Sequence, residues 1–224
     1  MVMGTAVKNG KSVKVHTVYK TKDGVRVPGV TTVLGILGKP ALIHWAWDLG
    51  TKGIDYKKYR DDKADIGTLA HEMVMCHLKG EELDTSGYTE KQIDLAETCF
   101  LKYLEWEDEH DIKPILIEEP LISEKHRYGG TMDCYCNLDG ILTLLDFKTG
   151  KAIYNEYFYQ LGGYRELLTE NKYETKRYII LRLGRDETEG FEVKERIDLE
   201  DETKIFLKLT EVYHLQRELK NKYK

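Results

Sequence analysis

Residues 129–148 read GGTMDCYCNLDGILTLLDFK, and this stretch decides the fold. Asp139-Gly140 is a strong two-residue turn signal between two strand-like runs. If these two residues form the tip of an antiparallel hairpin, pairing outward from the tip opposes Asp133 to Asp146. The stretch therefore predicts a β-hairpin that brings two carboxylates side by side.

Opposed carboxylates on one face of a sheet repel, because their Cβ atoms lie only about 4.5–5.5 Å apart. A hard cation with oxygen ligands removes this repulsion. Side chains alternate between faces, so Lys148 projects on the same side as Asp133 and Asp146. Two acids and an ammonium suit phosphodiester hydrolysis: the acids hold a metal that polarises the phosphate and activates water, and the lysine orients the water or stabilises charge. Against this, Asp, Lys and Gly are ordinary hairpin residues, and a D-x-K tripeptide is common by chance.

Three motifs follow one another in the order typical of the PD-(D/E)XK nucleases. They are GGTMD at 129–133, LLDFKTG at 144–150 and a Gln-x-x-x-Tyr helix segment at 160–164. The chain resembles the RecB-like exonuclease branch, which includes mitochondrial genome maintenance exonucleases and many phage or prophage nucleases. Residues 28–47 are similar to the amino-terminal segment of phage-type members. The family's leading-helix signature, Gly-Thr-x-x-His-Glu, is matched by Gly67, Thr68, His71 and Glu72.

This resemblance implies an α/β, restriction-endonuclease-like core, in which helices flank a mixed central β-sheet. It implies Mg²⁺ or Mn²⁺ as cofactor and Asp133, Asp146 and Lys148 as catalytic residues. The implied metal ligands are His71, Asp133, Asp146 and the Phe147 backbone carbonyl, with Glu119 as a supporting ligand through water. The implied substrate-binding residues are Gln160, Tyr164, Thr149 and Lys151. Many relatives carry Glu at the position of Asp146, but Asp is normal in the RecB-like branch.

We expect residues 1–224 to form a single nuclease domain. Its parts are an amino-terminal hairpin and helix extension (1–64), a catalytic core (65–197) and a carboxyl-terminal helix (198–224). Periodicity predicts a buried helix over 65–79, a strand over 115–122 and a helix over 154–170. The last helix is expected to pack over the sheet through Ile205, Phe206, Leu209, Val212 and Leu215.

Two glycines inside the predicted helix over 154–170 need a reason, since glycine costs a helix about 1 kcal/mol relative to alanine. Gly162-Gly163 predicts a close approach by another backbone or by a ligand. A packing contact explains the pair as well as DNA does.

The composition describes a cytoplasmic globular protein. Hydrophobic residues make up 41% of the chain and charged residues 33%, and no run approaches the length of a membrane span. A net charge of −5 argues mildly against generic nucleic-acid binding. Two local groups of basic residues could contact the phosphate backbone of a nucleic acid, or could simply be solvated surface charges. They are Lys57, Lys58, Arg60 and Lys63, and Lys172, Lys176, Arg177, Arg182 and Arg185.

The four cysteines argue against an iron–sulfur cluster. Relatives that carry a cluster use one early cysteine and three near the carboxyl terminus, but Cys136 is the last cysteine here. Cys134 and Cys136 alternate with the acids, so they are expected on the opposite face as small core residues. We expect neither a cluster nor a structural zinc.

The sequence therefore predicts an Mg²⁺- or Mn²⁺-dependent DNA exonuclease acting on single- or double-stranded ends, in phage, prophage or host DNA recombination, repair or replication. The alternatives are a structure-specific endonuclease on the same core, a catalytically inactive nucleic-acid-binding module, and an unrelated metal-binding protein. A homo-oligomer or a recombination partner is compatible with the sequence, which specifies neither. No membrane association is expected.

Overall fold

The structure is a computed structural model that describes residues 5–8, 11–14 and 17–223. In chain order the elements are β1 (Thr5–Lys8), β2 (Lys11–Lys14), β3 (Tyr19–Lys20), β4 (Arg26–Val27), α1 (Val30–Leu34), α2 (Pro40–Thr51), α3 (Tyr56–Lys79), α4 (Glu90–Glu107), β5 (Ile112–Ile117), β6 (Pro120–Ser123), β7 (Tyr128–Thr131), β8 (Cys134–Leu138), β9 (Ile141–Lys148), α5 (Asn155–Glu170), β10 (Arg177–Leu183), β11 (Phe191–Arg196) and α6 (Glu200–Lys222).

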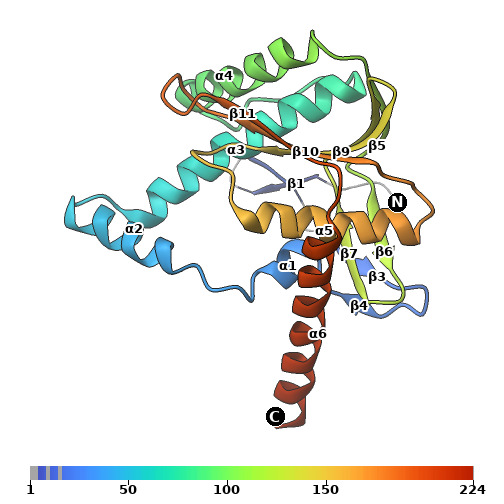
Figure 1. Ribbon diagram of the computed structural model, residues 1–224. Helices are drawn as coiled ribbons and strands as arrows, with labels where there is room; N and C mark the ends of the chain where they lie inside the picture. Colours follow the sequence, from blue (N-terminus) through green and yellow to red (C-terminus); the bar gives the residue numbers. More distant parts are fainter. Residues whose placement is uncertain (1–4, 9–10, 15–16, 224) are drawn as a thin grey trace.

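A five-stranded mixed sheet forms the centre of the molecule, in the order β11-β10-β9-β8-β5. Strands β9 and β10 pair in parallel and are joined by the crossover helix α5, whereas the other neighbours are antiparallel. Helices α3 and α4 cover one face, and α5 covers the other (Figure 1). The predicted α/β architecture, a mixed central sheet flanked by helices, is confirmed.

Each face of the sheet has its own hydrophobic core, because side chains alternate along the strands. Leu145 and Phe147 of β9 pack with α3 and α4, while Leu144 packs with α5. Cys134 and Cys136 are buried on the α3–α4 side, as expected for small core residues, and the four thiols are free. Within the part of the chain that is described, no helix combines the length and apolarity needed to cross a membrane.

The hairpin of β8 and β9 has the register that the sequence predicts. Cys134 pairs with Leu145, and Leu138 pairs with Ile141 beside the turn. Asp139 and Gly140 have φ of 54° and 85°, as a two-residue hairpin turn with both central residues left-handed requires. Continued by one residue, this register opposes Asp133 to Asp146.

The strand expected over 115–122 and the first arm of the hairpin expected over 129–148 are each interrupted, and the two interruptions lie beside one another. The strand expected over 115–122 divides into β5, in the central sheet, and β6, which pairs with β7 in a separate two-stranded sheet. Glu118 adopts a left-handed φ of 51°, which an extended strand does not permit, and its N–H donates to the Asp133 carbonyl at 3.1 Å. The first arm of the long hairpin breaks at the same level, between β7 and β8. Asp133 therefore lies at a bend, where its side chain is not confined to a flat sheet face.

Helix α3 begins nine residues earlier than expected, at Tyr56. Its amino-terminal half is mostly polar and exposed, so this part of the helix has no apolar periodicity from which it could be predicted. Asp55 caps it by accepting hydrogen bonds from the N–H groups of Lys57 and Lys58.

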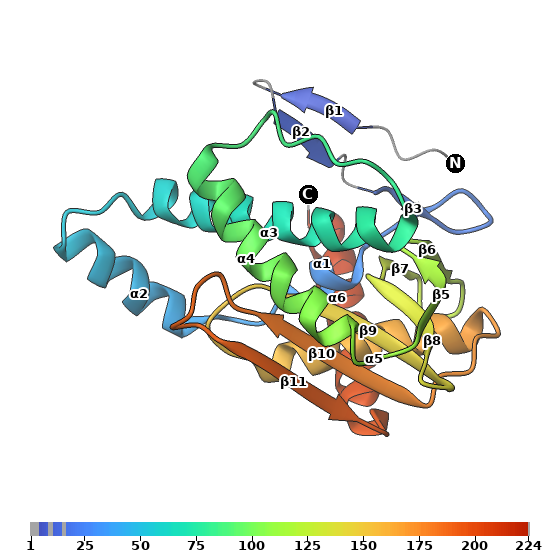
Figure 2. The same ribbon diagram turned by 90° about the horizontal axis from the view of Figure 1, so that it is seen from above.

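The expected packing of the last helix over the sheet is wrong. Helix α6 packs its amino-terminal part against α5 and α1 and then projects away from the body of the molecule (Figures 1 and 2). Of the five residues expected to pack on the sheet, Phe206 is fully buried against α5, while Leu215 is 63% exposed. The spacing of the apolar residues predicted a helix correctly, but an apolar stripe on a helix does not specify which element packs against it.

The glycine pair in α5 marks the place where α6 begins. A Cβ at Gly162 would lie 2.7 Å from the Thr203 backbone nitrogen, and a Cβ at Gly163 would lie 2.9 Å from the Phe206 ring. Of the two explanations left open by the sequence, close approach by another backbone is the one observed at Gly162.

Gly162→Ala is expected to destabilise the protein by about 1–3 kcal/mol, because the added methyl group meets immovable backbone. The matched control is Gly50→Ala in α2, where a Cβ meets nothing within 4 Å. The control should be neutral or stabilising by up to about 1 kcal/mol, the helix-propensity gain. Denaturant unfolding measures both, and equal effects of the two substitutions would contradict this packing.

Candidate active site

The Asp133 side chain is held by contacts from two different elements, β9 and α3. Its Oδ2 accepts a hydrogen bond from the Phe147 N–H at 2.8 Å, and its Oδ1 lies 2.9 Å from His71 Nε2 on α3. Burial raises the pKa of Asp133, but His71, Lys148 and the Phe147 N–H outweigh it and lower the pKa to about 2. Asp133 is therefore a fixed anion at neutral pH.

Asp146 lies near the end of β9 and is only 1% exposed. Its Oδ2 is 2.5 Å from Lys148 Nζ, while its Oδ1 is buried and receives no hydrogen bond from any described residue. Burial raises the pKa of Asp146 to about 6, a shift that Asp133 reinforces and Lys148 opposes. A buried carboxylate oxygen without a donor is costly, and a cation at that point would satisfy it.

Lys148 stays charged although it is largely buried. Burial lowers its pKa, but the carboxylates of Asp146 and Asp133 outweigh that effect and raise the pKa. Its Nζ also lies 5.2 Å from the centre of the Tyr157 ring, a cation–π contact that further favours the ammonium form. Lys148 is thus a cation at neutral pH and a donor of hydrogen bonds, not a base.

The two layers of helices meet at this site. A Cβ at Gly67 of α3 would lie 2.5 Å from Thr149 Oγ1, so the glycine lets α3 pass close to the turn that follows Lys148. This contact accounts for a glycine one turn before His71. On the other side, Gln160 of α5 donates a hydrogen bond to the Tyr164 hydroxyl at 3.0 Å, as their helical spacing predicts.

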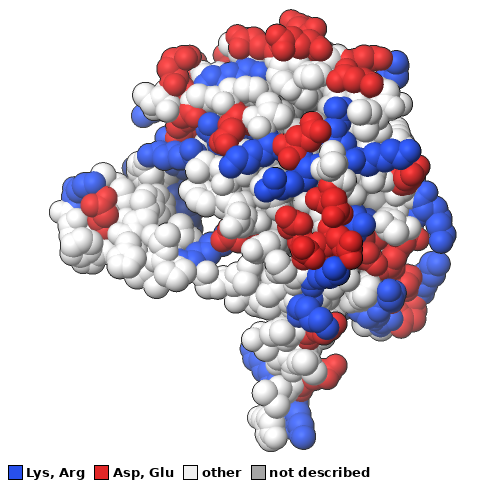
Figure 3. All heavy atoms as spheres, viewed as in Figure 1, with Lys and Arg blue, Asp and Glu red and all other residues white. Residues whose placement is uncertain are grey.

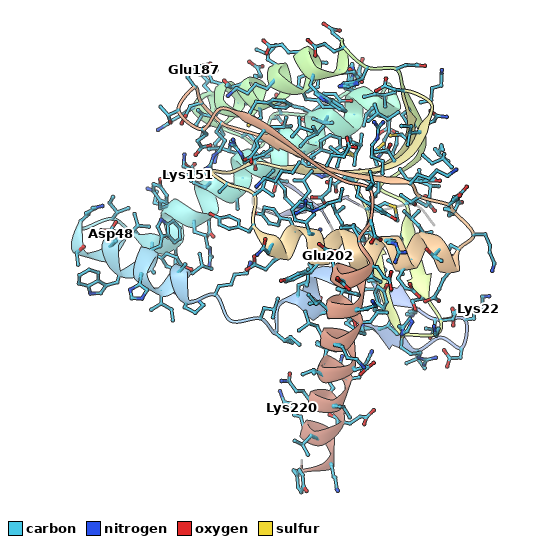
Figure 4. The ribbon with its side chains drawn as sticks, in the orientation of Figure 1. Lys22, Asp48, Lys151, Glu187, Glu202 and Lys220 are labelled. Carbon is cyan, nitrogen blue, oxygen red and sulfur yellow. The ribbon has the colours of Figure 1, made fainter. Side chains whose placement is uncertain are left out.

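Two other residues singled out by the sequence, Lys151 and Glu119, are exposed. Lys151 is exposed on the loop between β9 and α5 (Figure 4). Glu119 is also exposed, and the structure places Glu118 rather than Glu119 beside Asp133 and His71. The family resemblance favoured Glu119, but the chain bends at Glu118, whose left-handed φ of 51° turns this residue out of the expected strand. Glu118 also forms an ion pair with Lys79 at 2.8 Å.

Two of the basic candidates for nucleic-acid contacts have structural partners instead. Arg182 pairs with Glu192 and donates to the Gly150 carbonyl at 3.1 Å, which fixes the turn after Lys148. Arg185 pairs with Glu189 at 2.6 Å and is buried. The basic character of a segment does not show that Arg182 and Arg185 are buried beside acidic partners.

A cavity of about 870 Å³ opens beside His71 and Asp133. Its wall is formed by β3, β4, α1 and the distal part of α6, which together contribute Arg26 and Arg217. The nearly buried Asp146 is not part of this wall. Neither Arg26 nor Arg217 lies in a motif, so neither was predicted as a site residue.

Charge is unevenly distributed over the surface. On the face shown in Figure 3, acidic side chains gather where α5 meets the start of α6, whose first turn contains Glu200, Asp201 and Glu202. A polyanion is repelled from such a patch. The arginine-lined cavity offers a more favourable approach to Asp133.

The sequence matches no family model and no curated protein. Among solved structures, the fold is similar to that of a protein from Eubacterium rectale named as a candidate exonuclease. The TM-score is 0.50 and the identity 13%, over 67% of this chain and 65% of the other. This chain therefore spans slightly less than two thirds of that protein's length. An alkaline exonuclease of Laribacter hongkongensis aligns over 71% of this chain and 91% of its own at 14% identity, but its TM-score of 0.34 is too low to carry an argument. The likeness to the first protein concerns the fold.

The raised pKa of Asp146 predicts a pH-dependent stability difference. Its folded-state pKa of about 6 exceeds the usual 3.8, so ionisation of this carboxyl opposes folding increasingly as pH rises between these values. The stability of Asp146→Asn relative to the natural protein should therefore increase from about pH 4 to about pH 6.5 and then level off. Urea unfolding in EDTA at several pH values measures this difference. A difference that is constant, or that grows towards acid, would contradict the burial of a strained carboxylate here.

Proposed function

We propose that this protein is a divalent-metal-dependent deoxyribonuclease that acts from DNA ends. The observation that carries the proposal is the buried Asp146 carboxylate, one oxygen of which has no donor in the described part of the chain, beside the anionic Asp133 and the cationic Lys148. The fold likeness to a candidate exonuclease and the order of the sequence motifs support it.

The donor set fits a hard divalent cation. Asp133 and Asp146 would hold Mg²⁺ or Mn²⁺ together with the Phe147 carbonyl and His71, and an imidazole beside carboxylates is compatible with Mn²⁺. When bound, the ion supplies Lewis-acid polarisation of the phosphate and lowers the pKa of water. His71 already lies 2.9 Å from Asp133 Oδ1, so α3 supplies this donor from the opposite layer.

Each residue of the site then has a distinct task. Asp133 stays ionised because its pKa is about 2, and the Phe147 N–H fixes its orientation. The Lys148 ammonium, held by Asp146 and the Tyr157 ring, stabilises charge that develops on the phosphate and orients water by hydrogen bonding. We assign Gln160 and Tyr164 of α5, and Thr149 and Lys151 of the preceding loop, to contacts with the substrate backbone.

Loss of Lys148 is expected to remove most turnover while leaving metal binding in place. Lys148→Met keeps the aliphatic packing on Tyr157 but deletes the charge, so kcat should fall about 10²–10⁴-fold on end-labelled single- or double-stranded DNA with Mg²⁺ or Mn²⁺. Manganese binding, followed by calorimetry, should remain, and Lys113→Met, an exposed lysine paired with Asp111, is the matched control.

Near-full cleavage by Lys148→Met, or equal cleavage by Asp146→Ala and the natural protein, would remove this assignment. The same assay on end-blocked circular DNA separates the two modes of action. An exonuclease leaves closed circles intact, whereas a structure-specific endonuclease on the same core opens branched circular substrates. Binding without cleavage of any DNA would indicate an inactive nucleic-acid-binding module.

The cavity wall predicts where the substrate backbone lies. Arg26→Gln and Arg217→Gln should each weaken DNA binding at all sequences and reduce the slope of log Kd against log salt by about 1. Fluorescence anisotropy at several salt concentrations measures this, with Lys113→Gln as the control. Unchanged slopes for both arginine variants would place the DNA elsewhere.

A further inference from the structure

A second group of metal-ligating side chains lies away from Asp133 and Asp146. His126 is in the turn between β6 and β7, and Glu166 and Glu170 are one helical turn apart in the carboxyl-terminal half of α5. One ligand atom from each residue can be chosen such that all lie within 4.8 Å of one another. The turn and the helix are side by side in the fold, since β6 and β7 both contact α5.

The two glutamates are unfavourably placed without a cation. They carry like charges at i and i+4, which destabilises a helix. Glu170 is the last residue of α5, where the helix dipole disfavours a negative charge. Within residues 17–223, neither carboxylate forms an ion pair with a lysine or arginine. The side chain of Glu166 is only 17% exposed, so solvent screens this repulsion incompletely.

His126 completes the group. Its Nε2 is buried, makes no hydrogen bond with any described residue, and lies 3.5 Å from Glu166 Oε1. Two ligands of one tetrahedral zinc ion, each about 2.0–2.1 Å from the metal, are separated by roughly 3.4 Å. The observed 3.5 Å between His126 Nε2 and Glu166 Oε1 is close to this separation and exceeds the usual length of a direct hydrogen bond.

A neighbouring hydroxyl orients the group. Ser123 Oγ donates to Glu170 Oε1 at 2.5 Å and accepts a hydrogen bond from the backbone N–H of His126 at 2.8 Å. Such contacts fix the direction of a ligand before the ion arrives, and their loss typically weakens metal affinity about 10–100-fold.

We propose that His126, Glu166 and Glu170 bind a Zn²⁺ ion that fastens the β6–β7 turn to α5. One imidazole and two carboxylates leave a fourth position for water, and the imidazole nitrogen favours Zn²⁺ over Mg²⁺. Because β7 leads directly into Asp133, the ion stabilises the segment that presents this acid. The proposal does not depend on the proposed nuclease activity.

The test uses the full chain with Asp146→Asn, which removes one of the two carboxylate ligands of the first candidate metal site. Equilibrium dialysis against ZnCl₂ with elemental analysis should give one Zn²⁺ per chain, and the thermal transition should rise with zinc and fall back with chelator. Adding His126→Gln or Glu170→Gln should abolish this ion and the zinc-dependent shift, and Ser123→Ala should weaken zinc affinity at least about 10-fold. His110→Gln, which removes a histidine paired with Asp139, should change neither.

The proposal is overturned if the Asp146→Asn chain takes up no Zn²⁺, or if it retains the ion after Glu170→Gln. Loss of stability in Glu166→Gln without any zinc uptake by the parent chain would show that a protonated His126 bridges the glutamates instead. If His126→Gln fails to fold, Glu170→Gln decides the question, because its side chain keeps the shape of the glutamate.

Discussion

The buried Asp146 carboxylate is the constraint on which the rest of the site depends. It lies on a central strand under α5, where solvent cannot stabilise it, and one of its oxygens has no donor among the described residues. Lys148 offsets part of this cost from two residues along the same strand. Such an arrangement lowers the stability of the fold and suits the binding of a cation, and it therefore supports the proposed metal site.

The bend between β7 and β8 sets the orientation of the Asp133 side chain. Because β6 and β7 leave the central sheet, Asp133 is released from strict strand alternation and can reach both the Phe147 N–H and His71. His71 comes from α3, which covers the opposite face of the sheet from α5. The site is therefore assembled at an edge where the two helical layers come together, and glycines at the close contacts permit it. Gly67 admits Thr149 on one side of the sheet, and Gly162 admits the start of α6 on the other.

One short segment of the chain, from His126 through β7 to Asp133, links the two proposed metal sites. The β6–β7 turn contains His126, and β7, which follows it, leads into Asp133. Strand β7 already rests on α5 through the Tyr128 hydroxyl, which donates to the Gly163 carbonyl at 2.8 Å. An ion between the turn and α5 would add a bond at the free end of this segment, whereas the ion at Asp133 would act at its base.

The sequence by itself determined the β8–β9 hairpin, its register and the placing of Asp146 and Lys148 two residues apart on the same strand, because a two-residue turn and strict alternation are local properties of the chain. It also determined the Gln160–Tyr164 contact, which one helical turn defines. Only the tertiary structure decided that Glu118 and not Glu119 lies beside Asp133, that Arg182 and Arg185 are internal, and that α6 packs on α5. These outcomes depend on a left-handed residue and on contacts between segments far apart in sequence. No local periodicity encodes such contacts, since the same apolar stripe or the same arginine suits several neighbours.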